Sequence, residues 1–378
     1  MARRSWPSAL LAIRIAAVLI GVLLVGALPV QAQGAASGDE IGYLEGRLES
    51  VAPSEDGGTA VVALDDGRVV EAMLPAPHPD AEEAAPPFRA GQRVEVYVSP
   101  GPDGRRTYVV SDWIRRPALG WLVALFLLVS VAVARYKGLR AFVSTAASLT
   151  IVIGFVVPRI VAGADPVWTS LLGVGGILVL AIYFVHGVSW STTVALVGTA
   201  IAVVVTMGLG VFFANAAHLT GYGSEDAGMI AAVAPQVALR GLMLAGLLVG
   251  ALGALTDITI VQAAVVRELA HADPDCDLRT LYLRGMRVGT DHVGSLVNTL
   301  VLAYTGAALP LLVLLSQGSF GLSRAVNMEL IAAEVVHTLV GSIGLVLAVP
   351  LTTSIAAFAF RGDRLPLRPG ELDAGHAH

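Results

Sequence analysis

Hydrophobic and polar positions follow two different patterns along the chain. Between residues 41 and 116, short runs of alternating apolar and polar positions are separated by turn formers such as Asp56-Gly57-Gly58 and Asp65-Asp66-Gly67. A period of two is typical of half-buried β-strands. The runs lie at residues 43–51, 59–64, 68–74, 92–98 and 108–114. This pattern predicts a small N-terminal all-β domain, and its short strands favour an OB-like barrel, the shape of oligonucleotide- and oligosaccharide-binding domains.

Long apolar runs replace this alternation after residue 117. A transmembrane helix needs about 20 predominantly apolar residues. Runs of this kind lie at residues 118–134, 141–161, 167–186, 192–214, 229–255, 292–315 and 330–360. The last run is too long for one straight crossing, and we expect Pro350 to break or tilt it. The fold class is therefore an α-helical polytopic membrane protein.

The first 38 residues contain a further apolar segment. Arg3 and Arg4 precede an apolar run at residues 15–30, which Gln31-Ala32-Gln33 follows. A basic start and a short apolar run fit a secretory signal peptide and equally an uncleaved first transmembrane helix. Both interpretations export the β domain, and the expected total is seven to eight transmembrane helices.

The distribution of lysine and arginine predicts the orientation in the membrane. These residues concentrate in the connections at 135–140 and 257–290 and in the tail from residue 361, and short cytoplasmic loops are the basic ones. We therefore expect a multi-pass bacterial inner-membrane protein with an extracytoplasmic β domain and a cytoplasmic C-terminus. Arg115 and Arg116 are exceptions on the outer side.

The expected domains are residues 1–38 as signal or first helix, 39–116 as the β domain, 117–360 as the helical domain and 361–378 as a cytoplasmic tail. Within the long connection, residues 258–269 have mostly helical apolar spacing. An interfacial or re-entrant helix is expected there.

Composition excludes several classes of protein. The chain is 55% hydrophobic and only 14% charged, which is too apolar for a soluble enzyme. Residues 39–116 hold 15 acidic and 8 basic residues, so the β domain lacks the basic stripe that nucleic acid requires. Cys276 is the single cysteine and can form no internal disulfide. Because phosphate-binding, paired-cysteine and nucleophile motifs are absent, we expect no cofactor, no catalytic residue and no enzyme; a metal ligand set is left open.

Polar residues inside the apolar runs form the candidate site. They are Asp257, Asp291, Asn298, Thr299, Glu334 and His337. Ionisable side chains in hydrocarbon cost a few kcal/mol each, so they are expected to face protein. Asp291 and Asn298 lie two turns apart on one helix face, and Glu334 and His337 share a face of another helix. Carboxylates and amides suit a hard cation or a proton relay, which predicts a polar path across the membrane.

A simpler interpretation stays open for the same residues. Asp257 and Asp291 would be solvated at the cytoplasmic interface or cap helices, and Glu334 would pair with His337 or an arginine. His337 would then be a pH-sensitive gate or a histidine with no role.

Several motifs resemble the YibE/F family of bacterial membrane proteins. They are Gly250-Ala-Leu-Gly-Ala-Leu-Thr-Asp257, Gly289-Thr-Asp291, Gly294-Ser-Leu-Val-Asn298-Thr-Leu-Val-Leu-Ala-Tyr304-Thr-Gly306, Glu334, and Gly341-Ser-Ile-Gly344-Leu-Val-Leu-Ala-Val-Pro350-Leu-Thr352. The resemblance covers most of the chain from Tyr43 onward. It implies an integral membrane protein described as a permease, without an established substrate. The chain departs from the family at His337, a position associated with arginine in relatives.

The leading hypothesis is a permease or secondary transporter for an ion or small solute. A membrane-protein partner or a homo-oligomer is compatible with it, and nucleic acid is not expected. One alternative is a non-catalytic assembly or sensing subunit whose exported β domain binds a partner. A second is an intramembrane aspartyl hydrolase that uses Asp257 and Asp291 as a carboxylate pair.

Overall fold

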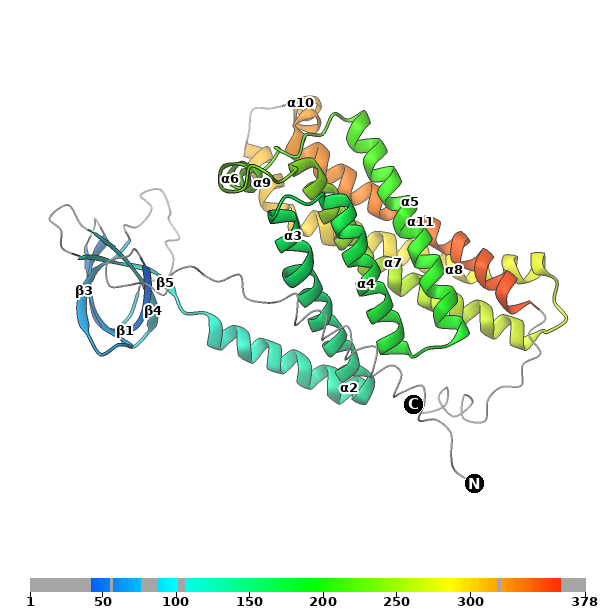
Figure 1. Cartoon of the computed structure of the whole chain (residues 1–378), viewed down its shortest axis with the longest axis horizontal. Helices are drawn as coiled ribbons and strands as arrows, with labels where there is room; N and C mark the ends of the chain where they lie inside the picture. The colour runs from blue at the N-terminus through cyan, green and yellow to red at the C-terminus, as the bar shows by residue number, and fades with distance from the viewer. Residues whose placement is uncertain (1–41, 55–56, 76–87, 101–105, 318–320, 362–378) are drawn as a thin grey trace, which may run out of the picture. The chain divides into compact units, whose positions relative to one another are not determined.

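The computed structural model describes residues 42–54, 57–75, 88–100, 106–317 and 321–361. The chain forms two compact units, which divide between Arg135 and Tyr136 (Figure 1). The predicted signal or first helix at 1–38 lies outside the described residues, and so does the predicted tail beyond residue 361.

The first unit contains a closed β-barrel (Figure 1). Its strands are β1 (Gly42–Ser54), β2 (Gly57–Leu64), β3 (Val69–Met73), β4 (Arg93–Pro100) and β5 (Arg106–Trp113). Neighbouring strands follow the order β1-β2-β3-β5-β4, and β4 pairs again with β1. All pairs are antiparallel except β3 with β5, which meet in parallel at Met73 and Val109. The prediction of a small N-terminal β domain is confirmed, and each expected strand overlaps an observed one.

Alternation along the strands builds the core of the barrel. Leu48, Val62, Val94 and Val96 are almost completely buried, because every second side chain of a strand points to the same face. The β2–β3 turn is held by Asp66, whose carboxylate accepts hydrogen bonds from the backbone and guanidinium nitrogens of Arg68. The side-chain hydrogen bond from Arg68 holds the pKa of the Asp66 carboxyl below its ordinary value.

Helices make up the rest of the described chain. They are α2 (Arg116–Ile151), the π-helical turn η1 (Val152–Val156), α3 (Val157–Val161), α4 (Pro166–His186), α5 (Trp190–Ala216), α6 (Glu225–Val233), α7 (Leu239–Ala272), α8 (Leu278–Ala307), α9 (Leu309–Gln317), α10 (Leu322–Asn327) and α11 (Glu329–Phe360). Within the described residues, five helical segments are long and apolar enough to cross a membrane, or six if α8 and α9 form one bent span. The expected total of seven to eight is therefore not confirmed.

The first long helical segment is interrupted where the sequence predicted a connection. Arg135 in α2 has φ 50° and ψ −129°, so its backbone is not helical. The helix resumes immediately after Arg135, and η1 and α3 continue it to Val161. The break therefore falls within the expected connection at 135–140, but residues 136–140 are helical.

Two further boundaries differ from the sequence-based expectation. The run at 229–255 is divided between α6 and α7, because Ala234 precedes Pro235 and has φ −142° and ψ 65°. A residue before proline is disfavoured in the helical region, and proline has no N–H to continue the ladder. The connection at 257–290 is instead the end of α7 and the start of α8, joined by a short turn at residues 273–277. No separate interfacial helix occupies residues 258–269, which belong to α7.

The run at 292–315 is bent rather than continuous. α8 ends at Ala307 and α9 begins at Leu309, and the two axes differ by 65°. Pro310 stands at the second position of α9, where its ring and missing N–H prevent a straight continuation from α8. Pro350 does not have this effect, since α11 is helical from Glu329 to Phe360.

Helices α5, α7 and α11 pack against one another at the centre of the second unit, with α4 and α8 on its flanks (Figure 1). A Cβ at position 198 of α5 would lie 2.5 Å from Thr352 Oγ1 of α11, and one at position 344 of α11 would overlap Thr206 Oγ1 of α5. Glycine at both positions therefore sets how closely α5 and α11 approach. A hydrogen bond of 2.5 Å between the hydroxyls of Thr199 and Thr259 joins α5 to α7.

Gln262 joins α7 to both α8 and α11. Its side chain is 1% exposed, and Nε2 donates to the carbonyl oxygen of Gly285 at 2.9 Å and to Thr353 Oγ1 at 2.7 Å. A Cβ at position 289 would lie 2.8 Å from Gln262 Oε1, so α8 passes directly over the amide. The buried amide therefore holds α8 against the central helices.

We expect Gly344→Ala to destabilise the protein by about 1–3 kcal/mol, because the added methyl group overpacks the α5–α11 contact. The measurement is thermal unfolding of the full chain in detergent or nanodiscs. Gly175→Ala in α4 is the matched control, since a Cβ there meets no atom within 4 Å. Equal effects of the two substitutions would contradict the packing argument.

We expect Gln262→Leu to cost about 1–3 kcal/mol, because it leaves the Gly285 carbonyl without its side-chain donor. The same unfolding assay measures this cost. Gln236→Leu, which removes an exposed hydrogen bond to the carbonyl of Val161, is expected to change stability by less than about 0.5 kcal/mol. A Gln262 variant as stable as the Gln236 variant would show that the amide does not hold α8 in place.

Candidate functional site

The structure divides the six predicted site residues among three places. Asp257 lies on α7, on the side of His186 of α4. Asp291, Asn298 and Thr299 lie on an exposed face of α8, and Glu334 and His337 lie on α11 beside a pocket. These three places differ in their surroundings within the described part of the chain.

The surroundings of Asp257 are basic. It interacts electrostatically with His186, and His186 in turn interacts with Lys137 and Arg140 of α2. Arg140 also lies over the ring of Phe184, 5.3 Å from the ring centre. Asp257 does not close its helix as the sequence suggested, because α7 continues to Ala272.

Asp257 and Asp291 do not form a pair in the described structure. The charge that acts on Asp257 comes from His186, and no hydrogen bond between described residues links it to Asp291. Asp291 is exposed on α8. An aspartyl hydrolase needs two carboxylates close enough to share a proton, so this arrangement gives that alternative no support.

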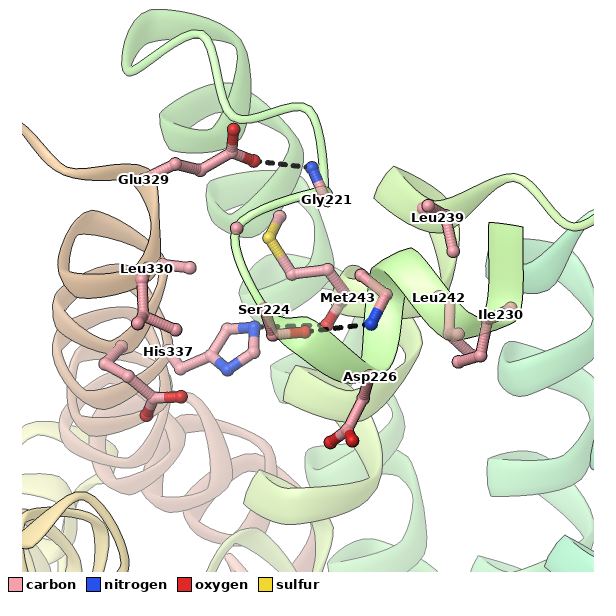
Figure 2. Close-up of a pocket in the computed structure, with 14 residues that line it drawn as sticks. Gly221, Ser224, Asp226, Ile230, Leu239, Leu242, Met243, Glu329, Leu330 and His337 are labelled. Carbon is pink, nitrogen blue, oxygen red and sulfur yellow. Dashed lines mark hydrogen bonds between the residues drawn. The ribbon is translucent and has the colours of Figure 1, made fainter. Parts of the chain in front are cut away.

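Figure 2 shows a pocket of about 250 Å³ where α6, α7 and α11 meet. Its walls come from the loop before α6, from α6 itself and from the first turns of α7 and α11. The polar groups that line it are Ser224, Asp226, Glu329, Glu334 and His337. The pocket is partly open and apolar over most of its wall, which is the usual character of a small-ligand site.

Glu329 fastens the loop that forms the rim of this pocket. Its carboxylate accepts a hydrogen bond from the backbone N–H group of Gly221 at 2.6 Å (Figure 2). It also accepts hydrogen bonds from the backbone N–H group of Thr220 at 2.6 Å and from the Thr220 hydroxyl at 2.7 Å. Gly221 has φ 86°, and a Cβ there would lie 2.5 Å from the backbone nitrogen of Arg240. The rim is therefore held between the starts of α7 and α11, and the negative charge of Glu329 is stabilised by its hydrogen bonds to the rim.

His337 lies deeper in the pocket, about 12 Å along α11 from Glu329 at a rise of about 1.5 Å per residue (Figure 2). Its Nε2 is 3.1 Å from the carbonyl oxygen of Met243 in α7. A carbonyl oxygen only accepts hydrogen bonds, so Nε2 carries a proton and donates it. The other ring nitrogen, Nδ1, is then left to accept a hydrogen bond or to bind a proton.

Glu334 lines two pockets at once. It contributes to the pocket of His337 and to a second one of about 240 Å³ between α9, α11 and the end of α8. Tyr304 of α8 also lines the second pocket and interacts electrostatically with Glu334. A Cβ at Gly250 of α7 would lie 2.5 Å from the Tyr304 hydroxyl oxygen, so this side chain reaches across from α8 to α7.

Sequence reasoning missed three residues of this region as site residues: Asp226, Glu329 and Tyr304. Tyr304 stands in the motif that carries the family resemblance, and that motif was the signal for it. Asp226 was missed because it lies three residues before the predicted run at 229–255, so its position in the short helix α6 was not predicted.

The arrangement suits a cation or a proton. Asp226 and Glu334 carry carboxylates that make no recorded hydrogen bond or ion pair within the described residues, and His337 offers Nδ1. Carboxylate oxygens and imidazole bind protons and cations readily. In the described part of the chain no group of three or more His, Cys, Asp or Glu side chains is placed to hold a metal ion.

Comparison with known proteins gives a family and no function. No curated protein and no solved structure matches the chain. A family model described as YibE/F-like protein matches residues 122–362, which include all the helices from α4 to α11 and more than half of the chain. The chain belongs to the YibE/F-like protein family.

Proposed function

We propose that the protein is a membrane permease or secondary transporter for a cation or a small solute, and that its cargo or coupling ion meets Glu334 and His337. The observation that carries this proposal is the position of Glu334, which contributes to the walls of two pockets on α11. An ionisable side chain on an apolar membrane helix is costly and marks a functional site by default. Tyr304, beside Glu334, extends the polar region toward α7.

The proposal includes an orientation in the membrane. Arginines that flank the turn between α7 and α8, among them Arg267, Arg279 and Arg284, would lie in the cytoplasm, and the pocket of His337, at the opposite end of α7, would then face outward. The membrane would be the bacterial inner membrane, with an OB-like β domain outside, and the segment from Arg116 to Val161 would cross it twice, on either side of the break at Arg135. A helix within residues 1–38 would bring the number of spans to eight. Asp257 with His186 would form a separate polar group nearer the cytoplasmic side.

A non-catalytic assembly or sensing subunit is the second candidate, and the β-barrel favours it. Tyr43 is 62% exposed on β1 and pairs with Tyr97 of β4, with ring centres 5.3 Å apart. Exposed aromatic side chains are frequent at protein-binding surfaces. A partner that is captured by the full chain and lost in a Tyr43→Ser variant would support this candidate.

The test of the transport proposal is the total elemental and small-metabolite content of cells that lack or overproduce the protein. A transported species should shift in opposite directions in the two strains. Glu334→Gln and His337→Gln should each reduce the overproduction shift about tenfold or more, because an unpaired polar partner in the site costs about 1–3 kcal/mol.

The matched control is Ile343→Val, an exposed position on α11 that lines neither pocket. It should leave the shift unchanged. An unchanged shift in both polar variants, at normal protein levels, would contradict the assignment of these residues. No shift in any strain would contradict the transport proposal itself and favour the assembly subunit.

A further inference from the structure

The exposed face of α8 is polar over the length that would lie in the membrane. Its inner face packs on the central core through Val293, Leu296, Val297 and Leu300. On the opposite face every fourth or third residue is exposed, and we call this row the α8 seam: Asp291, Ser295, Asn298, Leu302 and Thr305. Four of these five side chains are polar, and Asp291 and Asn298 have no hydrogen bond or ion pair within the described residues.

Other helices of the same unit expose a different surface. The exposed positions of α5 include Val204 and Phe212, which are 65% and 63% exposed. Those of α11 include Leu339 and Phe358, at 54% and 79%. Apolar side chains of this kind are what a helix presents to lipid. The α8 seam differs from these surfaces of α5 and α11, and lipid is not its natural neighbour.

Facing lipid would be costly for this seam. Aspartate near the centre of a membrane helix is among the costliest side chains to insert, and amides and hydroxyls also need partners there. No described residue of the chain provides these partners for Asp291 or Asn298. Another polar surface must cover the seam.

The spacing of the seam matches a pair of packed helices. Successive seam residues are 4, 3, 4 and 3 positions apart. This alternation averages 3.5 residues and is the contact row of two helices that cross at a small angle. Gly294 and Gly306 flank the seam, and a Cβ at either position would meet no atom within 4 Å. A second helix could therefore approach closely there.

We propose that a second copy of this chain covers the α8 seam, so that two α8 helices pack about a twofold axis. Identical faces can pair because hydroxyl and amide groups both donate and accept hydrogen bonds, so Ser295, Asn298 and Thr305 complement their own copies. The charges also complement each other. Arg287 is exposed one turn before Asp291, so each copy brings one cation and one anion to the contact.

Disulfide cross-linking of the full chain in native membranes tests this proposal. In a Cys276→Ser background, single cysteines replace Ser295, Asn298 or Leu302, and copper phenanthroline oxidises the membranes. We expect each seam variant to give a cross-linked product of twice the monomer mass. Val204→Cys on α5 is the control for an exposed membrane position outside the seam, and it should stay monomeric.

Two results would overturn the proposal. Seam variants that stay monomeric on oxidation, while expressed at the level of the control, would show that no second copy lies on α8. A product whose mass fits the chain plus a different protein would show that the partner is not a second copy. Neither result bears on the transport proposal, which rests on α11.

Self-association in lipid vesicles gives an independent measurement. Two copies that carry different fluorophores are diluted with lipid, and energy transfer reports the dimer. Asn298→Leu should raise the dissociation constant about three- to thirtyfold, the range typical of one interhelical hydrogen bond in membranes. Val204→Leu should leave the constant unchanged. Equal constants for the wild-type chain and Asn298→Leu would contradict a role of the seam in association.

Discussion

Close packing between α5 and α11 is the constraint on which the helical unit depends. Lipid is as apolar as a leucine side chain, so membrane helices associate through shape and hydrogen bonds rather than through the hydrophobic effect. Gly198 and Gly344 bring the two backbones together at two levels. Hydroxyl and amide groups then join α7 to this pair through Thr259 and Gln262. α8 is held mainly by the same amide and by apolar contacts, and it lies at the edge of the unit.

This arrangement explains why the polar residues separate into distinct groups. The contacts among the three central helices are made by glycine, threonine and apolar side chains. Glu334 and His337 remain accessible because α6 and α9 are short and leave pockets around the start of α11. Asp291 and Asn298 face outward because the inner face of α8 is apolar. The pocket of His337 within one copy and the proposed contact of two α8 seams between copies are therefore separate consequences of the same packing.

Much of the fold could be predicted from residue patterns, and most of the differences have a local cause. Strand alternation predicted the β-barrel strands, and apolar runs located α4, α5 and α11 closely. Run length alone could not show which prolines interrupt a helix. Pro235 and Pro310 end or bend their helices, and Pro350 lies within a continuous helix. The surrounding packing decides that outcome for each proline.

The candidate site was only partly predictable for a related reason. Polarity inside an apolar run showed that each residue was unusual, and helical spacing showed which residues share a face. Neither property shows whether that face points inward or outward. Asn298 proved to face away from the core, while Tyr304, two turns later, reaches Gly250 of α7.

The central claim is that the pocket at the start of α11 is open to solutes as far as His337, and thiol accessibility tests it most directly. Single cysteines at Ala333 and His337 are compared with cysteines at Ile343 and Val346, in a Cys276→Ser background, by their rates of reaction with a membrane-impermeant maleimide. The account predicts fast labelling of the first two, which line the pocket, and slow labelling of the other two, which face outward on the apolar part of α11. Equal rates at all four positions, or slow labelling at 333 and 337, would contradict it.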